Sequence, residues 1–176
     1  LEFGSGTAEI SAYLARNCYC KIGLIDNSQK LLDKSENLFE SLGLETETYF
    51  LDVTQPLPID NNAYEVVYSS GLLAHFDDEN LQHIVNESAR IASRKVIHLV
   101  PNSRCEPYIK GKQIQMKNGT WKWGKEQDFE TLKPYFEKAG LTNIEEYSVA
   151  HKHALRFLPD DISMQTPDEG YLLVTV

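Results

Sequence analysis

Glycine and carboxylate residues near the start of the chain have the spacing of a nucleotide-binding loop. Gly4 and Gly6 follow a short apolar segment, and Asp26 stands 20 residues after Gly6, at the end of the next apolar segment. Glycine lets the backbone bend beside a ligand, and the first turn of a following helix offers free N–H groups. A carboxylate at the end of the second strand can accept hydrogen bonds from both ribose hydroxyls. The pattern predicts an adenosine pocket.

Three further features narrow the choice of adenosine ligand. Asp52 ends a third apolar segment, where its carboxylate can accept a hydrogen bond from the adenine amine. The dinucleotide fingerprint G-x-G-x-x-G has Glu9 in place of its third glycine, and that negative side chain disfavours a pyrophosphate. There is no G-x-x-x-x-G-K-[ST] P-loop. S-adenosylmethionine suits the pattern better, because it carries no phosphate and its ammonium group tolerates an acid such as Glu2.

Alternating strand and helix patterns would position these residues. Apolar segments predict five strands, at 1–3, 21–26, 47–51, 64–69 and 95–100. Helical periodicity between them predicts three helices, capped by Thr7, by Asn27 or Ser28, and by Asp77 or Asp78. The first helix runs to about Arg16 and has Ile10, Tyr13 and Leu14 on one face. This βαβα order predicts a parallel sheet with helices on both faces.

The pattern changes after residue 101. Residues 101–125 read as irregular, 129–139 as a helix, and 143–150 and 171–176 as two final strands. The predicted fold is a doubly wound α/β domain spanning 1–176, with a mostly parallel seven-stranded sheet that ends in an antiparallel hairpin. The chain begins at Leu1, inside a motif, so we expect the N-terminal part of the fold to be missing from it.

The motifs resemble a known enzyme family. The segments LEFGSGTA at 1–8, Asp26, FLDV at 50–53, Leu57-Pro58 and YEVVYSSGLLAHF at 64–76 resemble, in order and spacing, the motifs of class I S-adenosylmethionine-dependent methyltransferases. The resemblance covers about 1–100 by motif and the rest by topology. It implies S-adenosylmethionine as cofactor and in-line methyl transfer to an O, N or C nucleophile of a small molecule. An RNA or protein methyltransferase, or a non-catalytic cofactor-binding module, remains an alternative.

The resemblance also implies roles for individual residues. Gly4 and Gly6 would let the backbone pass beside the methionine part of the cofactor, with Glu2 acting on its ammonium group. The remaining cofactor contacts would be Asp26 at the ribose, Asp52 and Val53 at the adenine, and Ser69 and Ser70 on the methionine side. Asn27 would also contact the cofactor. Ala8 stands where many members have glycine, which implies tighter packing there.

His75 is the candidate general base. It lies just past the fourth strand, near where the methyl group would point, and the ordinary pKa range of histidine suits a base. A base is needed only if the nucleophile must lose a proton, and packing of His75 against the next helix is the alternative. His98 lies within an apolar strand, so we expect a buried core histidine there.

Residues 101–125 have an unusual composition. They hold six basic residues and one acidic residue, together with Tyr108, Trp121 and Trp123. We interpret this segment as a substrate lid whose aromatic residues shape the pocket and whose lysines favour an anionic substrate. A solvated loop with lysines on its outer face is the alternative.

The whole-chain composition limits the partners. A net charge of −9 makes nucleic-acid or anionic-membrane binding unlikely as a general property. Cys18, Cys20 and Cys105 form neither a disulfide framework nor a zinc-ligand set, so we expect no metal and reduced thiols in the cytoplasm.

Overall fold

Seven strands form a single sheet in the computed structural model, which describes residues 1–176. The strands are β1 (Glu2–Phe3), β2 (Ile22–Asp26), β3 (Thr46–Phe50), β4 (Tyr64–Ser70), β5 (Ala92–Pro101), β6 (Glu146–Val149) and β7 (Leu172–Thr175). Their order in the sheet is β3-β2-β1-β4-β5-β7-β6. The first five strands run parallel, and β7 runs antiparallel to both β5 and β6. The predicted doubly wound sheet with its terminal hairpin is confirmed.

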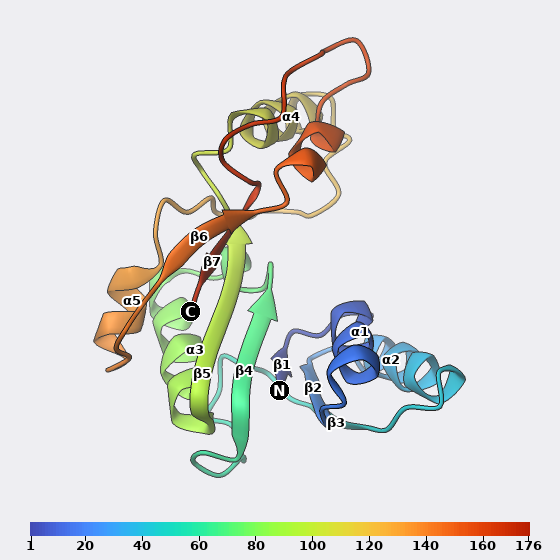
Figure 1. Ribbon diagram of the computed structural model, residues 1–176, viewed down its shortest axis with the longest axis vertical. Coiled ribbons are helices and arrows are strands. Elements are labelled where there is room, and N and C mark those ends of the chain that lie inside the picture. The colour runs from blue at the N-terminus through green and yellow to red at the C-terminus, as the bar shows by residue number, and fades with distance from the viewer.

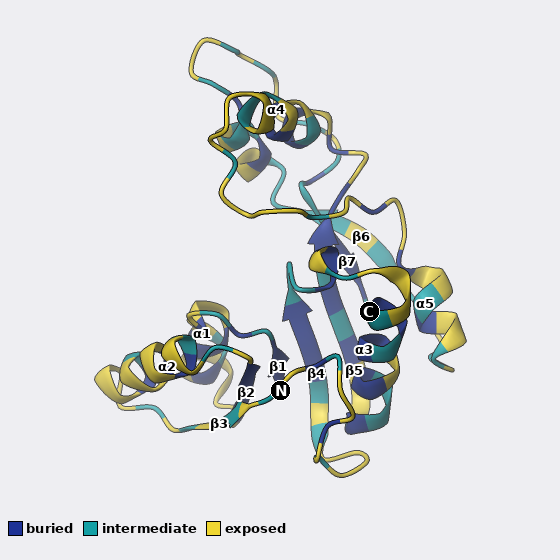
Figure 2. Cartoon of the chain, turned by 180° about the vertical axis from the view of Figure 1, so that it is seen from behind, coloured by how far each residue is buried: buried dark blue, intermediate teal, exposed yellow.

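Helices cover both faces of this sheet (Figure 1). One face carries α1 (Glu9–Cys18) and α2 (Gln29–Ser41), and the other carries α3 (Asp78–Ile91) and α5 (Lys133–Lys138). Successive residues of β2 show the division, because side chains alternate between the two faces of a strand. Leu24 packs with Ala12 and Leu32, whereas Ile25 joins the larger core that includes Leu81. Strand β2 is therefore buried on both sides (Figure 2).

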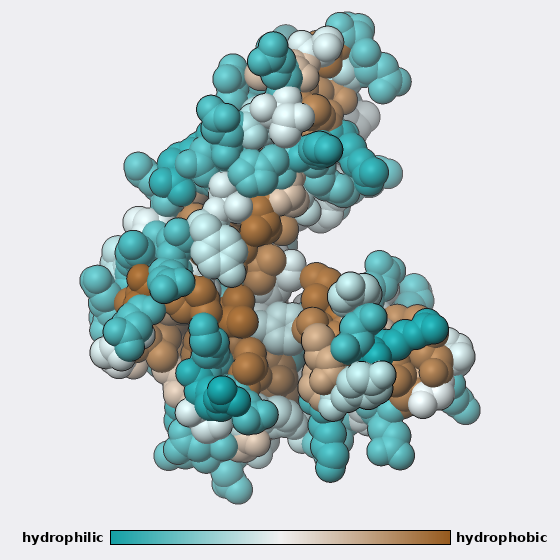
Figure 3. Space-filling model, viewed as in Figure 1, coloured by the Kyte–Doolittle hydropathy of each residue, from teal (hydrophilic) through white to brown (hydrophobic).

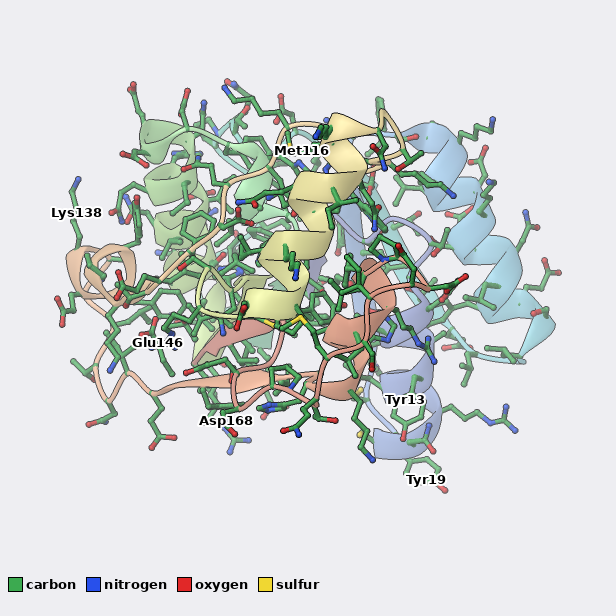
Figure 4. The ribbon with its side chains drawn as sticks, turned by 90° about the horizontal axis from the view of Figure 1, so that it is seen from above. Tyr13, Tyr19, Met116, Lys138, Glu146 and Asp168 are labelled. Carbon is green, nitrogen blue, oxygen red and sulfur yellow. The ribbon has the colours of Figure 1, made fainter.

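Of the three residues predicted on the inner face of helix α1, only Leu14 packs, partly buried, against the core. Ile10 and Tyr13 are 46% and 67% exposed, while the small residues Ala12 and Ala15 are buried against β2. Figure 4 shows Tyr13 at the outer side of the helix. Small side chains let the helix axis lie close to the sheet, which the larger residues would prevent. The predicted cap at Thr7 is also wrong, since the helix begins after Ala8, whose φ is +53°.

The other helix ends follow the sequence more closely. Asp77 caps α3, because its carboxylate accepts a hydrogen bond of 2.9 Å from the backbone N–H of Asn80. Ser28 occupies the N-cap position of α2 without a side-chain bond. The helix predicted at 129–139 is shorter, at 133–138, and Gly140 follows it with a φ of +79°.

The segment predicted as irregular contains a regular helix, α4 (Glu106–Lys117). Gly111 lies within this helix because the backbone of Phe157 packs closely against it. A Cβ at position 111 would lie 2.4 Å from the carbonyl oxygen of Phe157. Phe157 ends the short helix η2 (Lys152–Phe157), which packs on α4. We call residues 102–128 and 150–171 together the α4 module. It stands beyond the ends of β5 and β6 (Figure 1).

The space-filling view shows a deep notch between the α4 module and the α1–α2 side of the molecule (Figure 3). Its lower part is a groove over β4 and β5, lined by Tyr68, Ile97 and Leu99. None of the helices has the length and apolar character that crossing a membrane requires.

His98 lies in β5 at the centre of the core, where the sequence predicts a buried histidine. It is fully buried, and its Nδ1 and Nε2 lie 2.8 Å and 3.2 Å from the hydroxyl oxygens of Ser69 and Ser88. The ring of Phe136 meets it edge-on. Burial disfavours the charged imidazolium and lowers the pKa of His98 from 6.5 to about 3.

This burial predicts a pH dependence of stability that His98→Gln removes. The unfolded chain protonates His98 near pH 6.5, whereas the folded chain stays neutral, so stability is lost as the pH falls. Between pH 7 and pH 5 the free energy of unfolding of the wild type should fall by about 2 kcal/mol more than that of the variant, measured by urea unfolding. Glu2 titrates in the opposite sense in both proteins and cancels in the comparison. Equal pH slopes would contradict the prediction.

Candidate functional site

Two loops meet where the chain changes direction in the sheet. β1 and β4 are neighbours, but β1 leads to α1 on one face and β4 leads, through the short helix η1 (Leu73–His75), to α3 on the other. Ligands in open α/β sheets bind at such a switch point. Gly4 follows β1 with a φ of +63°, and a Cβ there would lie 2.5 Å from Cδ1 of Leu72, which follows β4. Glycine at position 4 is therefore required for the two loops to pack.

Asp26 is held in place at the end of β2. Its Oδ2 accepts a hydrogen bond from the backbone N–H of Gly6, and its Oδ1 accepts one from the N–H of Ser28, both 2.9 Å long. The residue is only 8% exposed. Each carboxylate oxygen keeps capacity for another hydrogen bond, because a carboxylate has about four acceptor sites.

A cavity of about 480 Å³ lies against these loops. The part of its lining at the ends of β1 to β4, which we call the sheet side, includes Gly4, Asp26, Asn27, Leu51, Val53 and Ser70. The rest of its lining, which we call the other side, includes His75, Phe76, Trp123, Glu126 and Tyr171. The lining contains two carboxylates and no lysine or arginine. It therefore offers no cationic side chain to a phosphate or another anion.

The predicted site residues divide into two groups. The cavity lining contains Gly4, Asp26, Asn27, Val53, Ser70, His75 and Trp123. It does not contain Glu2, Gly6, Asp52, Ser69, Tyr108 or Trp121. Gly6 still acts on the site, since its N–H positions Asp26.

Glu2 is turned into the protein. It is 3% exposed, and its carboxylate accepts a hydrogen bond of 2.6 Å from the hydroxyl of Ser11, which also bonds to Tyr68. Burial raises the pKa of Glu2 from 4.5 to about 7. The Glu2 carboxylate therefore does not line the cavity.

Asp52 and Ser69 are both engaged elsewhere. Asp52 is exposed, and its Oδ1 accepts hydrogen bonds from the backbone N–H and the hydroxyl of Thr54, which lower the pKa of the carboxyl group. Asp52 thus starts the turn that leads to Pro56. Ser69 is fully buried and bonds to His98, so the adjacent Ser70 takes its place at the cavity.

The aromatic residues of the α4 module form a second layer behind the cavity. Tyr108 is buried and its hydroxyl donates to the Glu126 carboxylate, and Trp121 packs on Trp123 with ring centroids 4.8 Å apart. Burial and the carboxylate raise the pKa of Tyr108, so the phenol stays protonated. Of the three predicted aromatic residues, Trp123 reaches the cavity and the other two support it.

Of the six basic side chains in 101–125, Lys112 alone is buried, at 5% exposure. Its ammonium group lies 3.2 Å from Glu126 and 2.6 Å from Asp128. The others are exposed, namely Arg104, Lys110, Lys117, Lys122 and Lys125. None lines the cavity, so the lysines do not make an anion site there.

His75 lies at the cavity and is exposed rather than packed under α3. Its Nδ1 is 3.1 Å from the carbonyl oxygen of Lys125, so Nδ1 carries the proton when the ring is neutral. Nε2 makes no hydrogen bond within the protein and is available to accept a proton.

Sequence reasoning missed several cavity residues, namely Phe76, Glu126 and Tyr171. Glu126 lies one residue beyond the predicted lid, and it reaches the cavity because the N–H of Gln127 donates to the carbonyl oxygen of Ala74, 2.8 Å away. No periodicity or motif marks that tertiary contact. Elsewhere, no three histidine, cysteine or acidic side chains gather in a metal-binding arrangement, and the three cysteines are free.

Comparison with known proteins identifies the family. A family model described as a methyltransferase domain matches residues 1–95, so the chain belongs to this methyltransferase family. It is an S-adenosylmethionine-dependent methyltransferase. No curated protein matches the sequence.

Solved structures share the fold. An S-adenosylmethionine-dependent methyltransferase from Thermotoga maritima is 18% identical and has a TM-score of 0.66, with 99% of this chain and 78% of that chain covered. Magnesium protoporphyrin IX methyltransferase from Synechocystis, solved with bound S-adenosylhomocysteine, is 16% identical and has a TM-score of 0.65, with 99% and 70% covered.

The cavity fits S-adenosylmethionine. Asp26 is fixed with spare acceptor capacity, and Leu51 and Val53 supply apolar surface. A Cβ at Gly4 would fill the space that Leu72 occupies. Two carboxylates without a cationic partner in the lining suit a positively charged cofactor better than a phosphate-bearing one.

The fit of Gly4 to its loop predicts the effect of Gly4→Ala. Alanine would adopt an unfavourable left-handed conformation and also collide with Leu72, so the free energy of unfolding should fall by more than about 2 kcal/mol in urea unfolding. Gly43→Ala is the matched control, since Gly43 has a φ of +66° with open space around its Cα. The control should lose only the backbone contribution, about 1 kcal/mol. Equal losses in the two variants would disprove the steric role of Gly4.

Proposed function

We propose that the chain transfers a methyl group from S-adenosylmethionine to an O, N or C nucleophile of a small molecule. The observation that carries this proposal is the single cavity that extends from Asp26 to Trp123 and Glu126. Its volume of about 480 Å³ lies in the range of small-molecule sites. Enclosure of both reactants in one cavity favours in-line attack, because alignment and removal of water supply much of the rate.

The sheet side of the cavity would hold the cofactor. In this assignment Asp26 accepts hydrogen bonds from the ribose hydroxyls, and Asn27 lies beside it. Leu51 and Val53 contact the adenine, while Gly4 and Ser70 border the methionine part. The predicted residues outside the lining would act indirectly, by holding these residues in place. They are Glu2, Gly6, Asp52 and Ser69. When bound, S-adenosylmethionine supplies an electrophilic methyl group on its sulfonium.

The opposite side of the cavity would hold the methyl acceptor. His75 is assigned as the proton acceptor for a nucleophile that must lose a proton, through its free Nε2. Trp123 and Tyr171 would shape the acceptor site. Tyr108 and Trp121 would hold that surface in place.

We treat 1–176 as one functional domain in which the α4 module, which contains all of 101–125 except Pro101, covers the acceptor. The free exposed thiols of Cys18 and Cys20 support a reducing, cytoplasmic environment. The exposed basic residues of 101–125 favour a second candidate, methylation of RNA or protein docked on this module. Binding to tRNA that weakens steeply with salt would favour that candidate.

Calorimetry tests the cofactor assignment. S-adenosylmethionine and S-adenosylhomocysteine should both bind the wild type, and Asp26→Ala should weaken binding roughly 10- to 100-fold, because hydrogen bonds to a charged group are lost. Asp33→Ala is the control, since Asp33 is an exposed carboxylate of the neighbouring helix whose only hydrogen bond is with Gln29. Binding of a nicotinamide dinucleotide in place of both compounds would refute the assignment.

A screen of methyl acceptors tests the reaction. Transfer of label from S-adenosylmethionine to a metabolite pool, and not to tRNA or protein, is the expected result. Labelling of tRNA or protein alone would establish the second candidate. Cofactor binding without transfer to any acceptor would indicate a non-catalytic module.

A further inference from the structure

Glu126 carries a negative charge that its protein partners compensate only in part. Lys112 lies between Glu126 and Asp128, at 3.2 Å and 2.6 Å, so one ammonium group serves two carboxylates. Oε1 of Glu126 takes the hydrogen bonds from Tyr108 and Lys112, and Oε2 takes none. The side chain is only 8% exposed, against 26% for Asp128. Water can solvate Asp128 more readily, so the uncompensated charge matters most at Glu126.

This charge stands among aromatic rings at the acceptor side of the cavity. Trp123, Tyr171 and Phe76 line the same cavity as Glu126. Aromatic faces attract cations, and a carboxylate in a poorly hydrated site needs an opposite charge when a ligand displaces its water. A neutral ligand would leave the charge of Glu126 offset only by the shared Lys112, and an anionic ligand would add repulsion.

The basic residues of the α4 module do not add a positive charge to the cavity lining. Lys112 is buried over the rings of Tyr108 and Trp121, at 5.8 Å and 5.5 Å from their centroids, and does not line the cavity. The exposed lysines do not line it either. An anionic acceptor, as the local lysine content suggested, would meet Asp26 and Glu126 in a lining that contains no lysine or arginine.

We propose that the methyl acceptor carries a protonated amine next to an apolar group, and that Glu126 with Trp123 and Tyr171 binds this amine. The inference rests on the proposed function, since it names the class of acceptor for the same cavity. Glu126 acts here as a binding residue that selects the ligand by charge.

Calorimetry in the presence of saturating S-adenosylhomocysteine tests the proposal with three probes of similar shape. These are 2-phenylethylamine, 2-phenylethanol and 3-phenylpropanoate, which are cationic, neutral and anionic at pH 7. The amine should bind the wild type about tenfold or more tightly than either other probe. In Glu126→Gln, the amine and the alcohol should bind with about equal affinity.

Glu106→Gln is the matched control. It removes one negative charge from the same α4 module, but Glu106 is exposed, forms no ion pair with Lys112 and does not line the cavity. This variant should keep the preference for the amine. Both tryptophans of the chain lie in the α4 module, so an unchanged emission spectrum shows that the module is intact in each variant. If Glu126→Gln alters the emission, Trp123→Leu replaces it, and should also weaken amine binding severalfold.

Several binding results would contradict the assignment of Glu126. Equal or tighter binding of the anionic probe, an amine preference that survives in Glu126→Gln, or its loss in Glu106→Gln would overturn the inference. So would binding of S-adenosylhomocysteine without binding of any probe. Failure to bind S-adenosylhomocysteine at all would instead refute the proposed function, so the two failures are distinguishable.

Discussion

Asp26 joins the ends of three neighbouring strands, and the cavity depends on that junction. Its carboxylate binds the N–H of Gly6 after β1 and of Ser28 after β2, while its backbone oxygen accepts the N–H of Leu51 after β3. These bonds give partners to three backbone N–H groups at the ends of the strands. They also fix a buried negative charge where a ligand can reach it. One residue therefore sets both the shape and the charge of the sheet side.

The other side of the cavity depends on a different constraint, the buried ammonium of Lys112. A charge at 5% exposure is costly unless it is paired, and here Glu126, Asp128 and the rings of Tyr108 and Trp121 surround it. Removing one partner leaves the others unbalanced, so the pairing restricts how the loop at 118–128 can sit on α4. The pairing with Lys112 thus fixes the carboxylate of Glu126, while the hydrogen bond from Gln127 to Ala74 holds its backbone beside the cavity.

The sequence predicts those features of the structure that have a local cause. Strand ends and Asp26 follow from apolar periodicity and from the rule that ligands bind at the carboxyl ends of parallel strands. The buried face of α1 was mispredicted because hydrophobicity favours Ile10 and Tyr13, whereas close packing on β2 selects Ala12 and Ala15.

Tertiary causes explain the remaining differences. Gly111 suits α4 only because the backbone of Phe157 approaches it, and no local pattern reports that contact. Glu126 enters the cavity through the bond between Gln127 and Ala74, which joins segments about fifty residues apart. Two constraints that arise in different parts of the chain thus place Asp26 and Glu126 in the lining of one cavity. Because the two carboxylates are held independently and the lining contains no lysine or arginine, the negative charge of the cavity does not depend on any single contact.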